Sequence, residues 1–198
     1  MSSKIHYNQA RYLTSATTLA QLPTDQGAEI AFIGRSNAGK SSALNAITNI
    51  KGLARTSTSP GRTQMVNYFS LDDSRRLVDL PGYGFAKVPV AVKARWEVMT
   101  ADYLENRETL AGLILVMDIR HPFREMDQQM IAWCMDFEVP LHILLTKADK
   151  LTPNAQKNAL FIAQKTLPKE ISVQIFSSLK KTGVDVARKK LDEWFGIN

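Results

Sequence analysis

The chain has 198 residues, 44% of them apolar, and 25 lysines and arginines stand against 19 acidic residues. This length and composition fit one compact domain with a sizeable core. The net charge of +6 favours an anionic macromolecule as partner, although a solvated basic surface would also produce it. A single cysteine, Cys134, excludes an intramolecular disulfide and fits a reducing cytosol, and we expect it in a buried helix.

Membrane insertion and export are not expected. No apolar run approaches the roughly 18 residues that a spanning helix needs, and the first residues lack the apolar core of a signal peptide. We therefore expect a soluble cytoplasmic protein. Residues 1–28 are mixed and polar and predict an N-terminal extension packed on the domain edge, while residues 29–198 predict a single α/β domain.

The order of apolar runs predicts the fold class. Strands are expected at residues 29–33, 64–71, 75–79, 112–118, 141–146 and 172–177. The short polar turn at residues 72–74 allows only an antiparallel hairpin, whereas intervening helices make the other strands parallel. We expect a three-layer α/β/α fold: a six-stranded, mostly parallel sheet, one antiparallel edge strand, and helices on both faces.

Three amphipathic helices carry apolar stripes that we expect to pack into the core. The stripes consist of Val92, Trp96, Met99 and Tyr103; of Met126, Met130, Trp133 and Phe137; and of Val184, Ala187, Leu191 and Trp194. Thr152 followed by Pro153 predicts a helix N-cap. The stretches 52–63 and 81–89 lack such periodicity and predict mobile loops beside the motifs described next.

A phosphate-binding loop follows the first expected strand. It has the pattern GxxxxGKS and consists of Gly34, Arg35, Ser36, Asn37, Ala38, Gly39, Lys40 and Ser41. A strand, a glycine turn and a helix in this order aim backbone N–H groups at a phosphate. Lys40 is expected to neutralise β- and γ-phosphate oxygens, and the Ser41 hydroxyl to bind Mg²⁺. This loop predicts a nucleoside triphosphate site and, with the expected sheet, a three-layer fold of the P-loop NTPase type.

A second motif, Asp79, Leu80, Pro81 and Gly82, closes the third expected strand. The Asp79 carboxylate can hold Mg²⁺ through water, and the Gly82 amide can face the γ-phosphate. A lone Asp-x-x-Gly is usually a turn, but this one ends the second strand of the hairpin, where a phosphate sensor is expected.

A third motif predicts the base. Thr146, Lys147, Ala148 and Asp149 follow the strand at residues 141–146. A carboxylate at Asp149 can accept hydrogen bonds from N1–H and the exocyclic amine of guanine, and adenine offers no such pair of donors. The Lys147 stem can cover the base plane. After the last strand, Ser177, Ser178 and Leu179 resemble a short loop whose backbone contacts the guanine oxygen, with leucine in place of the usual alanine.

Together the motifs resemble the EngB (YihA/YsxC) family of Era-like, translation-factor-type P-loop GTPases. The resemblance spans residues 27–195 and includes the stretches 34–41, 58–63, 79–86 and 146–151. It implies a bacterial GTPase that binds GTP and GDP, acts in assembly of the large ribosomal subunit, and is needed for normal cell division and septation. It also implies that Gly61, Arg62 and Thr63 belong to the first switch, with Thr63 on Mg²⁺; Thr56 and Thr58 are alternatives.

The catalytic expectations concern Lys40, Asn37, Thr63 and Gly82. Tyr83 stands where Ras-like GTPases have a water-positioning glutamine, so hydrolysis should depend on phosphate electrostatics. Asn37 is a candidate ligand for a K⁺ ion, as in some relatives, or is chosen for loop geometry; Arg35 and Arg62 are other candidate cations. We expect slow intrinsic turnover, partner stimulation, and GTP-dependent ordering of residues 55–65 and 80–89.

Rival functions remain at this stage. One is a GTP-dependent scaffold for division proteins that does not bind ribosomes, and the other is a small-molecule phosphotransferase, which the guanine motif argues against. We expect a monomer with the large ribosomal subunit as partner, and neither DNA nor a membrane. His6, His121 and His142 form no metal or triad arrangement, and His142 is expected in the sheet core.

Overall fold

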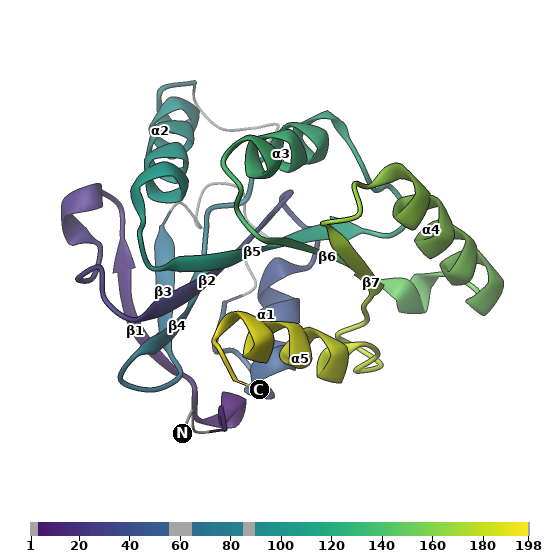
Figure 1. Ribbon diagram of the computed structural model, residues 1–198, viewed down its shortest axis with the longest axis horizontal. Coiled ribbons are helices and arrows are strands. Elements are labelled where there is room, and N and C mark those ends of the chain that lie inside the picture. The colour runs from purple at the N-terminus through teal and green to yellow at the C-terminus, as the bar shows by residue number, and fades with distance from the viewer. Residues whose placement is uncertain (1–3, 56–64, 85–89, 198) are drawn as a thin grey trace.

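The computed structural model describes residues 4–55, 65–84 and 90–197, with side chains described from residue 98 in the last segment. Within these residues a seven-stranded sheet has the order β1-β3-β4-β2-β5-β6-β7 (Figure 1). The strands are β1 (Arg11–Ala16), β2 (Ala28–Gly34), β3 (Val66–Ser70), β4 (Arg75–Asp79), β5 (Leu110–Asp118), β6 (Leu141–Thr146) and β7 (Ser172–Ile175). The α/β class and the mostly parallel sheet are confirmed.

The expected number of six strands is wrong, because the N-terminal stretch supplies β1. This strand pairs antiparallel with β3, which is in turn antiparallel to β4. The antiparallel β3 is therefore covered on its outer side by β1. The sequence did not predict this strand, because its side chains are exposed or half-buried up to Ala16 and show no apolar alternation.

Helices cover both faces of the sheet (Figure 1). The core on one face includes residues of α1 (Lys40–Thr48) and α5 (Val184–Trp194), together with Tyr7 of the short helix η1 (Tyr7–Gln9). The other core includes residues of α2 (Val90–Asn106), α3 (Glu125–Asp136) and α4 (Pro153–Thr166). Two further short helices are η2 (Leu19–Gln21) and η3 (Ala148–Lys150). No helix in the described segments is long and apolar enough to cross a membrane.

Most of the predicted apolar stripes face the core. The described members of the first stripe, Met99 and Tyr103, are buried, while Val92 and Trp96 have side chains outside the described part. The third stripe is buried apart from Trp194, which is partly buried. Phe137 corrects the second stripe: it is 53% exposed, because α3 ends at Asp136 and the ring stacks on Trp133 instead, with centroids 4.7 Å apart.

Other local predictions hold. Thr152 caps α4, and its side-chain oxygen accepts a hydrogen bond from the Ala155 amide. Cys134 is buried in α3, and His142 is buried in β6 between Ser172 and Gln174.

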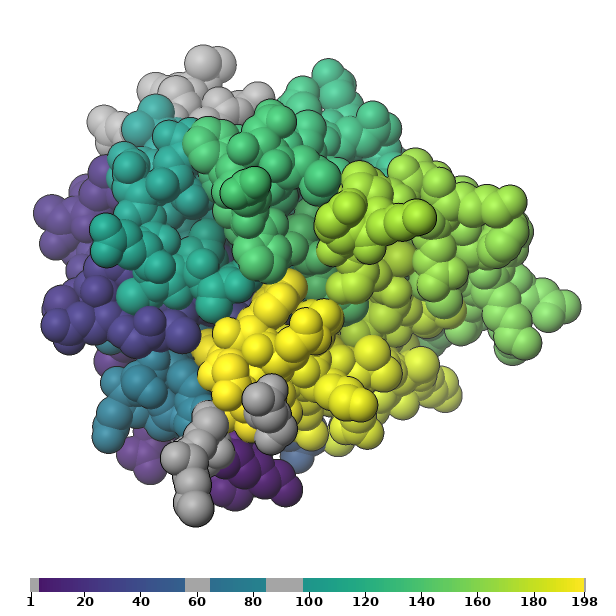
Figure 2. Space-filling model, viewed as in Figure 1, coloured from purple at the N-terminus to yellow at the C-terminus, as the bar shows by residue number. Residues whose placement is uncertain are grey.

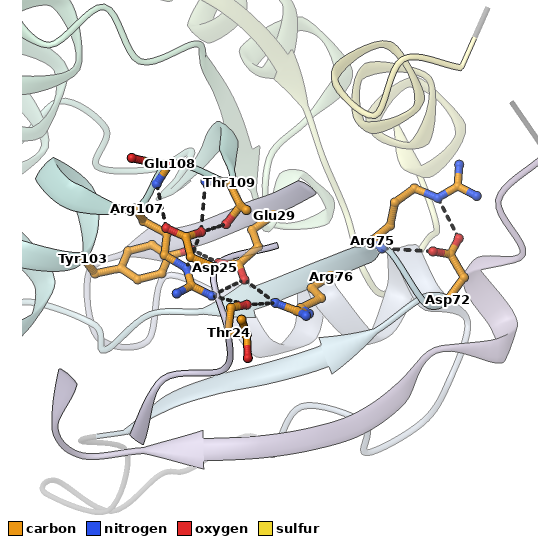
Figure 3. Close-up of polar contacts among 10 residues, drawn as sticks. All are labelled: Thr24, Asp25, Glu29, Asp72, Arg75, Arg76, Tyr103, Arg107, Glu108 and Thr109. Atoms are coloured by element: carbon orange, nitrogen blue, oxygen red, sulfur yellow. Dashed lines mark hydrogen bonds and ion pairs between the residues drawn. The ribbon is translucent and has the colours of Figure 1, made fainter. Parts of the chain in front are cut away.

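A buried polar cluster closes the end of the sheet opposite the phosphate loop (Figure 3). Glu29, at the start of β2, is 0% exposed. Its carboxylate accepts hydrogen bonds from Arg107 at 2.7 Å, and from Arg76 and Tyr103 at 3.0 Å each. Because Tyr103 and Arg107 lie in and just after α2, the cluster fixes that end of the helix to the central strand.

Candidate nucleotide site

The phosphate loop joins the carboxyl end of β2 to the first turn of α1. Gly34 must be glycine, because a Cβ there would lie 2.4 Å from the carbonyl oxygen of Val116 in β5. The chain then turns through Asn37 and Gly39, with φ of 62° and 102°, and α1 begins at Lys40. The free N–H groups of this first turn point to the loop, where they can bind an anion.

The motif at residues 146–149, which is predicted to read the base, contacts the phosphate loop directly. The Thr146 hydroxyl lies within hydrogen-bond distance of the carbonyl oxygens of Ala38 and Met117 and shares its single proton between them. Lys147 donates to the carbonyl oxygen of Asn37 at 2.6 Å and lies 3.0 Å from the Asp118 carboxylate. The two motifs, more than 100 residues apart in sequence, are therefore in direct contact.

Asp118 lines the candidate site and was not predicted from the sequence. Its signal was available, since it ends a buried strand as Asp79 does. Partial burial alone would raise the pKa of Asp118. Hydrogen bonds from Arg120 and Lys147 outweigh this effect and hold the pKa well below its usual range. A cavity of about 160 Å³ adjoins this corner, lined by Arg35, Ser36, Asn37, Ala38, Met117, Asp118, His121, Asp127 and Lys147.

Lys40 and Asp79 meet at the centre of the site. Both are buried, and the Lys40 ammonium forms an ion pair with the Asp79 carboxylate. Ser41 follows Lys40 in the same helical turn. A hydroxyl and a carboxylate are the hard oxygen donors that Mg²⁺ prefers, with further positions left for phosphate oxygens and water. The residues present fit that metal.

The Asp-x-x-Gly loop packs against the phosphate loop. Leu80 and Pro81 are buried and lead to Gly82, where a Cβ would lie 3.1 Å from the Gly34 carbonyl oxygen. Tyr83 donates its amide to that oxygen at 3.2 Å, and its own carbonyl accepts from the Ser36 amide at 2.8 Å. The Gly82 amide is thereby held beside the phosphate loop.

The Tyr83 side chain is hydrogen-bonded to α3, so its hydroxyl is not available to position a water molecule. Its hydroxyl donates to the Asp127 carboxylate at 2.5 Å, and Asp127 also accepts from the Arg124 amide at 3.0 Å. Burial, with the negative charge of Asp127, raises the pKa of Tyr83 and keeps it protonated. Asp127 was missed in the sequence because it reads there as an ordinary first-turn acid of a helix.

The predicted base side of the site centres on Asp149. The Ser177 hydroxyl donates to the Asp149 carboxylate at 2.6 Å and accepts from the Lys180 amide at 3.1 Å. Ala148 is buried and donates its amide to the Phe176 carbonyl oxygen at 3.2 Å. Ser178 is half-buried, and the Leu179 side chain is exposed. The structure therefore brings Ser177 and Asp149 together, and Ser178 and Leu179 continue the same loop.

Three predicted site residues, Gly61, Arg62 and Thr63, lie outside the described residues, as do the alternatives Thr56 and Thr58. Asn37 is described, and its φ of 62° supplies a loop-geometry reason for asparagine, which tolerates this conformation better than most side chains. Its role toward K⁺ stays a prediction.

A family model and several known relatives match this chain over the region that contains the candidate site. Residues 29–147 match the model of a family described as 50S ribosome-binding GTPase. The chain is 58% identical over 192 residues to a probable GTP-binding protein EngB of Coxiella burnetii, covering 96% of this chain and 94% of the relative. The corresponding Vibrio parahaemolyticus protein is 54% identical over 198 residues, covering 98% and 90%. The chain belongs to the EngB family.

As an EngB-family member, it is a GTP-binding protein and a P-loop GTPase. Solved structures agree on the fold. A crystal structure of a probable GTP-binding protein EngB superposes with a TM-score of 0.71 at 20% identity, covering 86% of this chain and all of that one. Era, in complex with MgGDPNP and part of 16S ribosomal RNA, gives 0.66 at 20% identity over 85% of this chain and 57% of its own.

Proposed function

We propose that this EngB-family GTPase is a GTP-dependent switch in assembly of the large ribosomal subunit, and through it supports normal cell division and septation in bacteria. The observation that carries the proposal is the junction of the three motifs. Lys147 joins the base loop to the phosphate loop, and Tyr83 joins the Asp-x-x-Gly loop to the same backbone. Both the base loop and the Asp-x-x-Gly loop would therefore respond to a change in the bound phosphates, as a switch requires.

The roles follow from the donors and acceptors present. The first turn of α1 and Lys40 would bind the phosphates, and Asp149, oriented by Ser177, would read guanine. Ser41 and Asp79, with Thr63 of the first switch, would hold Mg²⁺. That ion would supply positive charge on the β- and γ-phosphate oxygens. Asn37 is the proposed neighbour of a K⁺ ion in the same region.

Hydrolysis would use little side-chain chemistry. The Gly82 amide and the Lys40 ammonium would stabilise charge on the γ-phosphate as water attacks. Because the Tyr83 hydroxyl is bound to Asp127, it is not available to orient that water. This supports slow turnover in isolation and acceleration by a partner, so that hydrolysis acts as a timer.

Three observations support a ribosomal partner. The matching family is described as ribosome-binding, and Era, which shares the fold, was solved with ribosomal RNA. The net charge of +6 suits a polyanion.

Co-sedimentation with purified large and small subunits at near-physiological salt tests the proposal. The arms contain a non-hydrolysable GTP analogue, GDP, an ATP analogue or no nucleotide. We expect retention on large subunits with the GTP analogue alone. Equal retention in all arms, or none with guanine binding intact, would contradict the ribosomal switch while leaving the GTPase in place.

A further inference from the structure

The segment around α4 has a one-sided charge. Between residues 150 and 169 the chain contains Lys150, Lys157, Lys165 and Lys169 but no aspartate or glutamate. All four lysines are exposed. By comparison, α5 carries Asp185, Asp192 and Glu193 among its cations. Asp149 and Glu170 flank the stretch, and Lys150 lies 3.9 Å from the Asp149 carboxylate. The attraction for an anionic partner therefore comes from Lys157 and Lys165 within α4, where no acid is present.

The outer face of α4 also exposes large apolar side chains. Ala163 is buried in the core, so the inner face of the helix packs against the rest of the domain. On the solvent side Phe161 is 52% exposed and Ile162 is 51% exposed. The Lys165 ammonium lies over the Phe161 ring, 4.5 Å from its centroid, and Lys157 lies one turn before Phe161. Lysines and an aromatic ring thus share one helical face.

The location of α4 makes this face accessible. Figure 1 places the helix beside β7, at the end of the sheet opposite β1, and in Figure 2 it forms a margin of the molecule. The helix is also tied to the base-reading loop, because Gln156 donates to the carbonyl oxygens of Ala148 and Leu151 at 2.8 and 3.0 Å. By contrast, these contacts involve neither the phosphate loop nor the Asp-x-x-Gly loop.

This combination fits unpaired RNA. Single-stranded nucleic acids are bound by cations along the phosphates and by aromatic rings on which bases stack. An acid-free lysine face with a half-exposed phenylalanine supplies both groups, whereas an apolar protein contact would gain nothing from the lysines. We propose that the outer face of α4, formed by Lys157, Phe161, Ile162 and Lys165, binds a single-stranded segment of RNA.

The inference rests on the proposed function, because ribosomal RNA is the RNA which that function supplies, but its test does not need ribosomes. The probe is a fluorescently labelled single-stranded RNA of about twelve uridines, titrated with the full chain. Because α4 is anchored to the base loop and not to the phosphate-sensing loops, we expect equal affinity with GDP and with the GTP analogue.

Charge is tested with the double substitution Lys157→Gln and Lys165→Gln. If each lysine meets one phosphate, the slope of log K against log salt should fall in magnitude by about 1.4, roughly 0.7 per contact. The matched control is Lys4→Gln with Lys189→Gln, two exposed lysines outside α4 that undergo the same change of charge. We expect that control to leave the slope nearly unchanged.

Stacking is tested with Phe161→Ala, which should weaken RNA binding about tenfold, since one stacked base is worth roughly 1–3 kcal/mol. Phe137→Ala is the control, because Phe137 follows the end of α3, outside the α4 face, and its side chain is equally exposed at 53%. Thermal unfolding and GTP affinity of each variant establish that it is folded.

The outcomes separate the two proposals. RNA binding that depends on α4, without GTP-dependent retention on large subunits, supports the surface and contradicts the ribosomal switch. Absent RNA binding, or equal loss in variant and control pairs, overturns the α4 proposal and leaves the switch standing. Loss of subunit retention in Phe161→Ala but not in the lysine variant also overturns it, because an apolar protein contact would then occupy the face.

Discussion

Asp149 is the residue on which the choice of base should depend. Its carboxylate, held by Ser177 at 2.6 Å, offers two acceptors to the N1–H and amine donors of guanine. Asp149→Asn replaces one acceptor by a donor, which suits the 2-carbonyl of xanthine. We expect at least about 100-fold weaker GTP binding, corresponding to roughly 3 kcal/mol for two charge-assisted hydrogen bonds, and a gain in XTP binding.

Competition of GTP and XTP against a fluorescent guanine nucleotide measures this change. The control is Asp185→Asn, the same chemical change at a side chain that is 99% exposed. Unaltered GTP affinity in Asp149→Asn would remove Asp149 from the proposed base site.

His142 should make stability depend on pH in a window of its own. Burial of the ring lowers its pKa from 6.5 to about 4. The unfolded chain therefore binds the proton more readily between these values, and stability should rise with pH there and fall as the pH drops. The ceiling is about 1.4 kcal/mol per pH unit, or roughly 2 kcal/mol between pH 4.5 and 6.5.

Urea unfolding of the wild type and of His142→Gln across that range tests the assignment. Glutamine can still hydrogen-bond Ser172 or Gln174 but does not titrate, so the variant should lose the slope. The pKa values of three carboxyl groups, Asp25, Asp72 and Asp118, are lowered from the usual 3.8. Their effect on the pH dependence of stability therefore falls mainly below pH 3.8, outside the window of His142. Parallel slopes for both proteins would refute the role of His142.

At the scale of elements, the Glu29 cluster fixes one end of α2 to β2. Glu29→Gln removes a fully buried negative charge and leaves Arg76 and Arg107 without it (Figure 3). Breaking a buried pair in this way costs about 3–5 kcal/mol, and we expect about 3 because glutamine can still accept from Tyr103. Chemical denaturation at pH 7 measures the loss.

Glu193→Gln is the comparison for that experiment. Glu193 forms a surface pair with Lys190 at 2.7 Å and has a side chain 63% exposed. Surface pairs contribute at most about 1 kcal/mol. If both substitutions cost the same, the Glu29 cluster does not anchor α2.

The sequence predicted elements well where one face is buried and motifs are local. Strands 75–79 and 141–146 agree with the structure residue for residue, because every side chain of β6 and most of β4 is buried. Phe137 was misplaced because periodicity does not reveal that α3 ends one residue earlier. Asp118 contacts Lys147, and Asp127 contacts Tyr83. Both partners are distant in sequence, so no local sequence pattern could predict these contacts.

At the scale of the whole molecule, the N-terminal stretch completes the sheet. β1 covers the outer edge of β3, and Ala16 is buried. Before it, Tyr7 is buried beside α5, and its hydroxyl donates to Asp192 at 2.7 Å. The N-terminal segment thus contacts the sheet edge through β1 and the last helix through Tyr7. An uncovered strand edge is a template for pairing with another chain.

Deleting residues 1–17 should therefore lower the unfolding midpoint and produce concentration-dependent association. Nucleotide binding should be lost only in part in the fraction that stays folded. β1 is separated from the phosphate loop by β3 and β4 in the sheet, although the deletion also removes Tyr7 from the core that it shares with α1. Tyr7→Phe removes one hydrogen bond and should cost only about 1 kcal/mol without association. Size-exclusion chromatography over a range of concentrations, combined with thermal unfolding, compares the two. A deleted chain that elutes and melts like the wild type would mean that β3 needs no cover.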